Sequence, residues 1–335
     1  MTQTYTNPQE TISEEEFSYA QDVIQKLSQY YDTKVVGQEN LKNTLIYAII
    51  ADGHVLIESV PGLAKTTAAK AIASAVHGKF SRIQCTPDLL PSDIIGTQIY
   101  NQSEGQFETM LGPIFANFVL LDEINRSSAK TQSAMLEAMQ EKHVTIGKKT
   151  YLMPSDVFIV IATQNPIEQE GTYPLSEAQT DRFLMKETLN YPTPEEETAI
   201  LTRISYGEPE DAPAVLDVSD ITKIQEIAEK VYVDISIRKY ISMLVHATRH
   251  ADEILPDDLK NYVRLGASPR ASIAFMKLSK AVALMQGRTY VIPEDVKAVR
   301  YQALRHRISL SYSASSNGVT PEKIIDEVFA KIPTP

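Results

Sequence analysis

The sequence is poor in cysteine and in positive charge. It has one cysteine, Cys85, among 335 residues, which excludes an intrachain disulfide and a metal site built from several thiolates. We expect Cys85, in the stretch FSRIQCT, to be a small buried residue. Acidic residues outnumber basic ones by 43 to 32, which gives a formal net charge of −11. This balance argues against a general affinity for nucleic acid, which requires a basic surface.

Long apolar runs are also missing. No apolar stretch approaches the ~20 residues that a membrane-spanning helix needs. The first residues, MTQTYTNPQETISEEEF, are polar and acidic, unlike a signal peptide. We therefore expect a cytoplasmic protein. A hydrophobic share of 43% and a charged share of 22% are typical of globular proteins, and the length favours two domains.

Glycine is scarce in the segment that carries most information. Residues 54–66, HVLIESVPGLAKT, contain an apolar run, a Pro-Gly turn, and Lys65 and Thr66 at the start of a helical pattern. Strand, loop, lysine and helix form the layout of a cradle for nucleotide phosphates, because loop N–H groups and the positive end of the helix surround the anion. The lysine would reach the terminal phosphates, and the threonine hydroxyl would bind Mg²⁺.

This loop departs from the usual motif, G-x-x-x-x-G-K-[ST], at two positions. Ser59 and Ala64 occupy the places of the two outer glycines, and Gly62 remains. A serine at position 59 carries a cost if the backbone there needs a positive φ. Since Gly62 still permits a close approach of backbone to phosphate, we expect Ser59 to affect nucleotide affinity more than function.

Strand and helix patterns alternate through the first half of the chain. Continuous apolar runs, typical of strands buried on both faces of a parallel sheet, lie at 54–58, 80–86, 118–123 and 157–163. Helical patterns lie at 14–31, where Ser13 and Glu16 fit a capping box, at 39–51 and at 65–76. The alternation predicts a doubly wound α/β domain with the phosphate loop after its first core strand.

Two segments interrupt this alternation. Residues 97–111, TQIYNQSEGQFETML, and residues 143–153, HVTIGKKTYLM, alternate apolar and polar residues around short turns. Both patterns predict β-hairpins that project from the α/β body. The pattern alone leaves open whether the hairpins have a function.

The segment NYPTPEEE (190–197) marks a domain boundary. Thr193, Pro194 and Glu196 supply an N-cap, a proline at the first helical position and a capping glutamate. The segments after it have helical patterns, at 194–206, 219–231, 235–251, 269–286, 293–304 and 321–331, and no comparable strand pattern returns. We predict a nucleotide-binding domain over residues 1–192, with residues 1–12 disordered, and a helical domain over residues 193–335.

Two adjacent carboxylates end the strand pattern FVLLDE. Asp122 and Glu123 could be solvated loop acids. Because a phosphate cradle precedes them in the chain, we favour a functional explanation. In it, Asp122 holds Mg²⁺ and Glu123 polarises the attacking water. Asn165 follows another buried run, IVIATQ, and could be a turn former. We favour a role in orienting that water, because ligands of open α/β sheets lie at the carboxyl ends of the strands.

Two arginines are further candidates. Arg182, between Asp181 and Phe183, carries no decisive local signal. Arg270 lies in the first turn of the helix that Ser268 starts, where a cation opposes the helix dipole by ~0.3–1 kcal/mol. A bound phosphate would remove this disadvantage, because its negative charge would attract both the arginine and the helix end. Arg270 is therefore a candidate anion ligand that reaches from the helical domain to the nucleotide.

Six segments together resemble a known family. VVGQE, ESVPGLAKTT, FVLLDEINR, IATQNP, SEAQTDRF and ASPRA occur in the order and spacing of a MoxR-type AAA+ ATPase, over about residues 14–330. The resemblance implies a P-loop AAA+ domain, with a parallel sheet flanked by helices and two β-hairpin insertions (the helix-2 and pre-sensor-1 hairpins). An all-α lid domain would follow it. It also implies an ATPase that uses ATP and Mg²⁺ and releases ADP and phosphate.

The same resemblance assigns roles to residues. Val36 and Gly37 would flank the adenine, Thr66 and Asp122 would hold Mg²⁺, and Glu123 would activate water. The nucleotide contacts would come from Val36, Gly37, Val60, Pro61, Gly62, Leu63, Ala64, Lys65, Thr66, Thr67 and Asp122. Asn165 matches the sensor 1 position, Arg270 matches sensor 2, and Arg182 matches the arginine finger that acts on ATP in a neighbouring subunit. Arg126 could also approach a neighbour's site. Ala64 matches the family's own GLAKT form, whereas Ser59 departs from it.

The resemblance also implies partners. A homo-oligomer, a hexameric ring, would couple ATP turnover to chaperone-like remodelling or activation of other proteins, von Willebrand factor A domain proteins among them. Two alternatives remain open: a nucleotide-dependent binding switch or scaffold with little turnover, and an AAA+ motor that acts on DNA. The net charge of −11 disfavours the motor on DNA.

Overall fold

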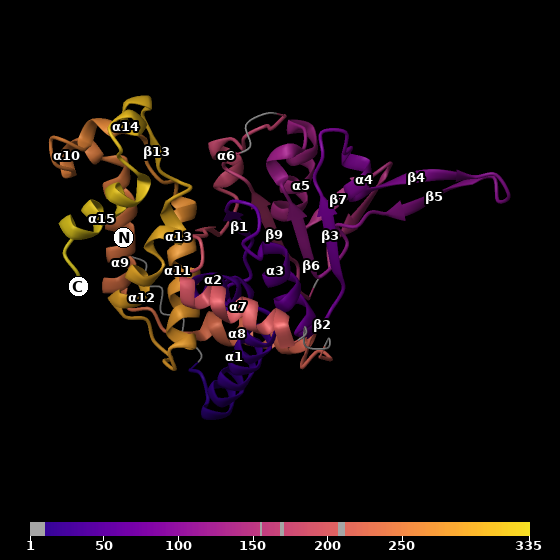
Figure 1. The fold of residues 1–335 in the computed structure, drawn as a ribbon, viewed down its shortest axis with the longest axis horizontal. Helices are drawn as coiled ribbons and strands as arrows, with labels where there is room; N and C mark the ends of the chain where they lie inside the picture. The colour runs from indigo at the N-terminus through magenta and orange to yellow at the C-terminus, as the bar shows by residue number, and fades with distance from the viewer. Residues whose placement is uncertain (1–10, 155, 168–170, 207–211) are drawn as a thin grey trace, which may run out of the picture.

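The computed structural model of this chain describes residues 11–154, 156–167, 171–206 and 212–335 (Figure 1). The expected disorder of residues 1–12 concerns mainly residues 1–10, which lie outside this described part. Among the described helices, none combines the length and the apolar character of a membrane span.

A parallel sheet of five strands forms the centre of the first half of the chain. Its order is β10 (Met185–Thr188), β1 (Val55–Glu58), β9 (Ile159–Gln164), β6 (Phe118–Asp122) and β3 (Phe80–Gln84). Every neighbouring pair is parallel. The predicted strands are confirmed, and β10 is one that the sequence did not indicate. Its residues Lys186, Glu187 and Thr188 give it no continuous apolar run, because it lies at an edge of the sheet.

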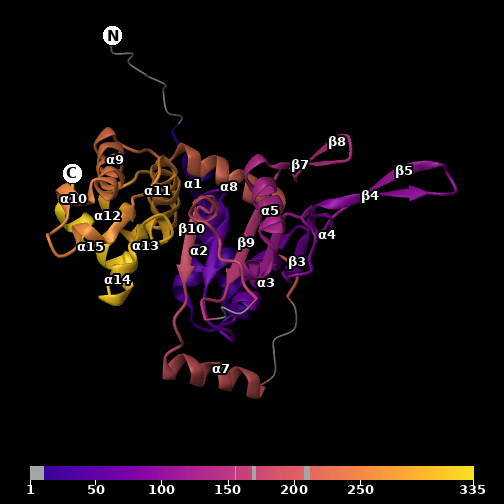
Figure 2. The ribbon, with the colours of Figure 1, turned by 90° about the horizontal axis from the view of Figure 1, so that it is seen from above.

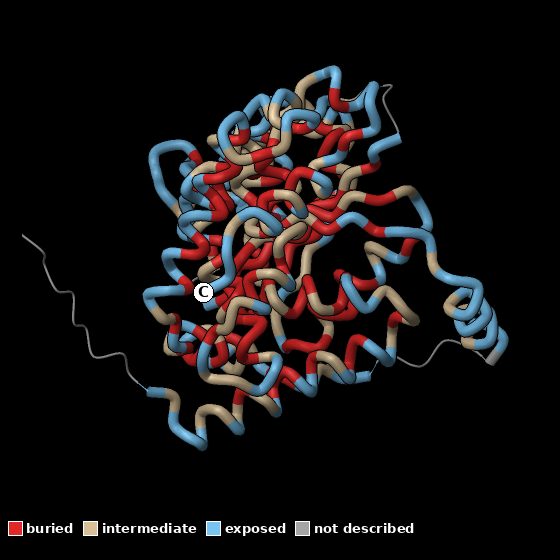
Figure 3. The backbone as a smooth tube through the Cα atoms, turned by 90° about the vertical axis from the view of Figure 1, so that its left-hand side faces the viewer, coloured by how far each residue is buried: buried red, intermediate tan, exposed pale blue. Residues whose placement is uncertain are grey.

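The two faces of the sheet bury different sets of side chains, because successive residues of a strand point to opposite faces. Phe118, Leu120 and Ile161 face α1 (Glu14–Lys34), α2 (Glu39–Ile50) and α3 (Lys65–Ser74). Val119, Leu121 and Val160 face α5 (Ala129–Glu141) in a second cluster. Figure 3 shows how these buried residues gather in the middle of the body. The predicted α/β layering is therefore confirmed.

Both predicted hairpins are present. β4 (Gly96–Asn101) pairs with β5 (Gln106–Leu111), and β7 (His143–Ile146) pairs with β8 (Lys149–Leu152), each antiparallel. Figure 2 shows both projecting from the body on the same side. The short α4 (Pro91–Ile95) immediately precedes β4.

The capping signals act as predicted. Ser13 and Glu16 form a reciprocal capping box at the start of α1. Thr193 N donates to the Glu196 carboxylate at 2.8 Å, and Glu196 N donates to Thr193 Oγ1 at 3.3 Å, at the start of α7 (Pro194–Tyr206). The domain boundary at 192/193 itself stays a prediction.

The rest of the chain is mainly helical, with two corrections. Its helices are α8 (Val218–Lys230), α9 (Ile235–Arg249), α10 (Ala251–Ile254), η2 (Lys260–Tyr262), α11 (Pro269–Met285), α12 (Pro293–Ala298), α13 (Arg300–Leu304), α14 (Tyr312–Ser316) and α15 (Pro321–Lys331). The predicted single helix 293–304 was wrong, since Val299, with φ −106° and ψ 13°, separates α12 from α13.

The second correction concerns strands. β11 (Leu216–Asp217) pairs with β2 (Val76–His77), and β12 (Val263–Leu265) pairs with β13 (Ser309–Leu310). Segments of two or three residues are too short to show a period of two, so the sequence pattern did not reveal them.

The chain returns to the first domain after α7. α8 packs against α1 and α2, and the Gln225 amide donates to the Ile49 carbonyl at 2.8 Å. Lys230 pairs with Glu16 at 2.8 Å. By contrast, α7 lies apart from the body in Figure 2, and its Leu201 and Ile204 are exposed.

Candidate functional site

The carboxyl ends of three adjacent strands bring most of the predicted site residues together. The loop after β1 leads through Gly62 to Lys65 at the start of α3. Asp122 ends β6, and Asn165 follows β9, which lies between β1 and β6. All three strands are parallel, so these residues share one edge of the sheet, where open α/β sheets bind their ligands.

The backbone at Ser59 does not need the positive φ that would make a serine costly there. Ser59 is not among the non-glycine residues with positive φ, and its hydroxyl donates to the Val60 carbonyl at 2.9 Å. Its N–H donates to the Gln164 carbonyl at 3.2 Å, which ties the start of the loop to β9. Lys65 Nζ donates to the Ser59 carbonyl at 3.0 Å. A serine therefore fits this position without a left-handed backbone.

The left-handed residue of the loop is Ala64 instead. It has φ 55° and ψ 20° and precedes the first turn of α3. Gly62 has φ 86°, and apart from Gly62 and its two chain neighbours no atom of the described residues lies within 4 Å of the position that a Cβ would take there. The backbone beside Gly62 is thus open to a phosphate, and the first-turn N–H groups of α3 are of the kind that bind anions.

Asp122 is buried, with 6% of its surface exposed, and its two oxygens have different partners. Oδ1 accepts from the Thr163 hydroxyl at 2.8 Å, and Oδ2 accepts from the Thr66 hydroxyl at 3.3 Å. Arg82 Nη2 lies 2.6 Å from Oδ2, so a positive charge already faces this oxygen. The Asp122 carboxylate and the Thr66 hydroxyl thus lie side by side and already bind a positive group. Such a pair of oxygen ligands suits Mg²⁺, which prefers oxygen.

Glu123 has an unusual backbone conformation, and hydrogen bonds fix the position of its side chain. Its φ of 57° and ψ of 51° are left-handed, a conformation that costs energy for a residue with a Cβ. Its N–H donates to the Thr163 hydroxyl at 2.9 Å. Its Oε2 accepts from the Gln84 amide at 3.0 Å and from Arg126 Nη1, in η1 (Ile124–Arg126), at 3.2 Å. The carboxylate is therefore oriented by side chains that the structure places beside it.

Three of these partners were not identified from the sequence. Arg82 and Gln84 alternate with the buried Ile83 along β3, so both point to the face that carries Asp122. Thr163 lies within an apolar run and connects the Asp122 carboxylate with the Glu123 N–H. The alternation of polar and apolar residues in FSRIQ was the available signal for Arg82 and Gln84. It could not show that they lie beside Asp122, because this depends on the register between β3 and β6.

Asn165 and Gly37 lie where their segments were expected to place them. Asn165 is 4% exposed, and its Oδ1 accepts from the Ile167 N–H at 3.1 Å, as in an Asx turn. Its role as a sensor stays a prediction. Gly37 has φ 68°, and a Cβ there would lie 2.4 Å from Glu196 Oε1. Val36 and Gly37, the expected adenine contacts, are thus close to the first turn of α7.

The two candidate arginines lie away from this edge. Arg182 precedes β10, and Leu184 N donates to the carbonyl of His54, the residue before β1, at 2.9 Å. Since β1 and β10 are parallel, Arg182 lies at the amino ends of the strands, opposite the loop that contains Lys65. It lines a hollow of about 490 Å³ with Glu137, Glu141 and His143 among its neighbours.

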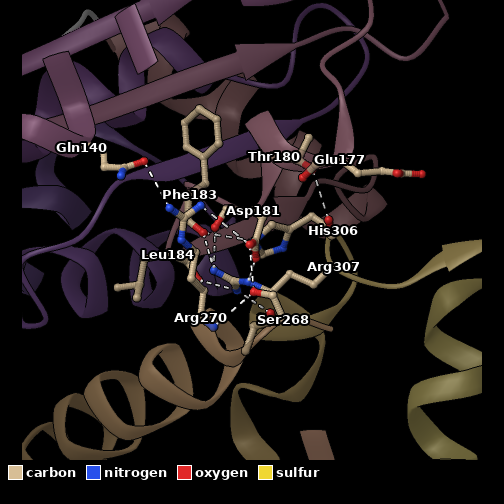
Figure 4. A network of polar contacts seen from close by, with 11 residues as sticks. Gln140, Glu177, Thr180, Asp181, Phe183, Leu184, Ser268, Arg270, His306 and Arg307 are labelled. Carbon is tan, nitrogen blue, oxygen red and sulfur yellow. Dashed lines mark hydrogen bonds and ion pairs between the residues drawn. The ribbon is translucent and has the colours of Figure 1, made fainter. Parts of the chain in front are cut away.

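Arg270 is on the same side as Arg182. Its Nη2 donates to Gln140 Oε1 at 3.1 Å, and its Nη1 lies 3.8 Å from Asp181 Oδ2 (Figure 4). Gln140 lies at the end of α5, next to Met139, whose carbonyl is 3.1 Å from His54 Nε2. The structure therefore does not bring Arg270 to the loop of its own chain, and the sensor 2 role stays a prediction.

The backbone at Ala64 leads to a first prediction. We expect Ala64→Gly to raise the free energy of unfolding by up to ~1 kcal/mol, because glycine adopts a positive φ without a Cβ clash, although a more flexible unfolded chain offsets part of the gain. Urea denaturation measures the change. The control is Ala68→Gly within α3, which we expect to lose about 1 kcal/mol or more. A loss of stability for Ala64→Gly would contradict the assigned strain.

The pair between Arg82 and Asp122 leads to a second prediction. Arg82→Gln should lower the free energy of unfolding without nucleotide by about 1 kcal/mol, because Asp122 loses a charged but half-exposed partner, and the melting temperature should fall with it. It should also lower the Mg²⁺ concentration at which ATP raises the melting temperature, because no guanidinium competes for Oδ2. Arg300→Gln, which breaks a surface pair with Asp326, should leave the Mg²⁺ dependence unchanged. A higher Mg²⁺ requirement for Arg82→Gln would mean that Arg82 helps to bind the nucleotide.

Two family models match the chain. Residues 54–185 match the ATPase family associated with various cellular activities (AAA), and residues 257–328 match the AAA lid domain. The first range begins just before β1 and ends at the start of β10, so it contains the sheet edge with Lys65, Asp122 and Asn165. The second range covers α11 to α14 and most of α15.

Individual relatives align over most of the chain. Chaperone MoxR1 of Mycobacterium tuberculosis is 48% identical over 301 residues, which are 90% of this chain and 79% of that protein. YeaC of Bacillus subtilis is 42% identical over 311 residues, or 92% and 94% of the two chains. A protein of Cytophaga hutchinsonii whose crystal structure is described as that of an ATPase is 45% identical in sequence to this chain. The two structures superpose with a TM-score of 0.89 over 96% of this chain and 98% of that one. The chain therefore belongs to the MoxR-type AAA+ ATPases, the family that its sequence motifs predict.

Proposed function

We propose that this chain hydrolyses ATP to ADP and phosphate. The observation that carries the proposal is the meeting of the Lys65 loop, Thr66, Asp122 and Glu123 at one edge of the sheet. Thr66 and Asp122 would hold Mg²⁺, which would neutralise negative charge on the phosphates. Lys65 would bind the terminal phosphates through its ammonium group.

Glu123 would orient the attacking water and accept its proton. Glu123 directly follows Asp122 in the chain, and Gln84 and Arg126 donate hydrogen bonds to its Oε2. For proton transfer, the carboxylate would have to turn from these partners toward the water. Asn165, at the end of the neighbouring strand, would orient the same water.

A nucleotide-dependent binding switch is the second candidate function. The contacts of Glu123 with Gln84 and Arg126 favour it, because a carboxylate held in this way is not directed at a water. The two functions differ in turnover and not in ATP binding.

Steady-state phosphate release separates these candidates. We expect the wild type to release phosphate about 10²-fold faster than Glu123→Gln or more, since this is the usual contribution of a general base. Both proteins should bind ATP with similar affinity, because the Lys65 loop is unchanged. Equal rates in the two proteins, with ATP bound, would contradict the enzyme and support the switch.

We also propose that active sites are shared between copies of the chain. Arg182 and Arg270 lie at the amino ends of the strands and Lys65 at the carboxyl ends, and four residues of β1 alone span about 13 Å. A nucleotide on a neighbouring copy would fit these arginines better than the nucleotide of their own chain. We infer a homo-oligomer, a hexameric ring as in the family resemblance, in which Arg182 completes the neighbour's site.

Mixing two inactive variants tests shared sites. Arg182→Ala should bind ATP normally but turn over ~10³-fold more slowly, the usual effect of losing an arginine finger. Mixed with Glu123→Gln, it should regain part of the wild-type rate, because some sites would combine an intact Glu123 with an intact Arg182. Arg182→Ala that turns over at the wild-type rate would contradict the proposal.

The role of this turnover is the last part of the proposal. A relative at 48% identity is named a chaperone, and the two hairpins project from the body as surfaces that could contact another protein. We propose that turnover remodels or activates partner proteins, and that von Willebrand factor A domain proteins are among them.

A further inference from the structure

Asp181, the residue before Arg182, joins the Arg182 segment to the lid (Figure 4). Its Oδ1 accepts from Arg307 Nε at 2.8 Å. Its Oδ2 accepts from the Ser268 hydroxyl at 2.8 Å and lies 3.8 Å from Arg270 Nη1. One carboxylate thus binds two separate parts of the helical region, the start of α11 and the residues after α13.

Arg307 is buried, with 7% of its surface exposed. Its guanidinium contacts the turn that carries Arg182. Its Nη1 donates to the Leu184 carbonyl at 3.1 Å, and its Nη2 donates to the Phe183 carbonyl at 2.6 Å. Burial lowers the pKa of Arg307, and the charge of Asp181 opposes this shift. Arginine stays protonated in proteins, so a buried cation depends on these acceptors.

Neighbouring residues reinforce the same contact. The Thr180 hydroxyl donates to the His306 carbonyl at 3.2 Å, and His306 Nε2 lies 3.1 Å from the Phe183 carbonyl. Glu177, at the start of α6 (Glu177–Thr180), bonds Arg264 and Ser309 at the β12–β13 pair. The helical region therefore contacts segment 177–184 at both of its ends, at Glu177 and Leu184, and at Thr180, Asp181 and Phe183 between them.

The same segment is anchored to the sheet on its other side. The Phe183 side chain is fully buried in the cluster that faces α5. Leu184 N bonds the His54 carbonyl, and β10 continues directly into the sheet. Arg182 thus lies in a short turn that is bonded to the sheet on one side and to the lid on the other. These contacts limit how far the turn can move independently of the sheet and the lid.

We infer that Asp181 and Arg307 form a latch that makes the lid and the Arg182 turn move as one body. Arg307 is then a positioning residue: it sets where Arg182 points, without contacting a nucleotide itself. This inference rests on the proposed role of Arg182 in a neighbour's site. Its consequence is that a change of lid position in one copy alters the arginine offered to the next copy.

The experiment compares Arg307→Gln with Arg288→Gln. Arg288 forms another ion pair in the helical region, with Asp295 at 2.5 Å, but is not among the residues that bond the Arg182 turn. Both variants lose an arginine of the lid, so both report the cost of disturbing it. Arg307→Gln should lower kcat by about tenfold to a hundredfold, since displacement of a catalytic group has effects of this size. Its Kd for ATP should stay within about twofold of wild type.

Two further measurements test the latch, and the second of them separates a positioning role from a merely structural one. Hydrogen exchange of the amides at 178–184 should rise in Arg307→Gln and stay unchanged in Arg288→Gln. In the Arg182→Ala background, Arg307→Gln should cause no further loss of kcat, because both changes remove the same contribution. A further loss of kcat in that background would overturn the latch.

Asp181→Asn keeps the shape of the side chain and tests the latch from its other partner. If Arg307→Gln fails to fold, this variant gives the same measurements and should also lower kcat with an unchanged Kd for ATP. The latch is wrong if folded variants of both residues turn over as fast as Arg288→Gln while Arg182→Ala is slow. If Arg182→Ala itself turns over normally, the proposed function fails instead.

Discussion

Parallel pairing of β1 with β9 on one side and β10 on the other decides where each polar group of this protein can lie. In a parallel sheet all carboxyl ends share one edge and all amino ends share the other. Asp122 ends a strand, Lys65 and Asn165 come after strands, and the three meet at the first edge, whereas Arg182 precedes β10 and lies at the second. The division of polar groups between two edges is thus a property of strand direction.

Much of this arrangement could be predicted from the sequence, because buried parallel strands appear as continuous apolar runs. The runs at 118–123 and 157–163 located β6 and β9, and the carboxyl ends of these runs located Asp122 and Asn165. What could not be predicted depends on register or on distant contacts. Arg82 and Asp122 are 40 residues apart and Arg307 and Asp181 are 126 apart, and no local pattern connects such pairs. β10 was missed because an edge strand needs no continuous apolar run.

The phosphate loop shows a related limit. The sequence identifies which glycines are absent but not which backbone angles the fold requires. Ser59 was the position of concern, yet the left-handed angles fall on Ala64, Gly62 and Glu123. At Glu123 that conformation separates two consecutive carboxylates. Asp122 points to Thr66 and Arg82, and Glu123 points to Gln84 and Arg126. Neighbours in sequence therefore have distinct surroundings, which suits two distinct tasks.

The expected burial of Cys85 is confirmed, and its burial has a practical side. The side chain is fully buried, and burial raises the pKa of its thiol to about 12, so the reactive thiolate is scarce at neutral pH. A cysteine introduced on an exposed surface, such as the tip of the β4–β5 hairpin or the outer face of α7, would react with maleimide dyes far faster than Cys85. The natural chain is thus already suited to site-specific fluorescent labelling, without prior removal of a native thiol.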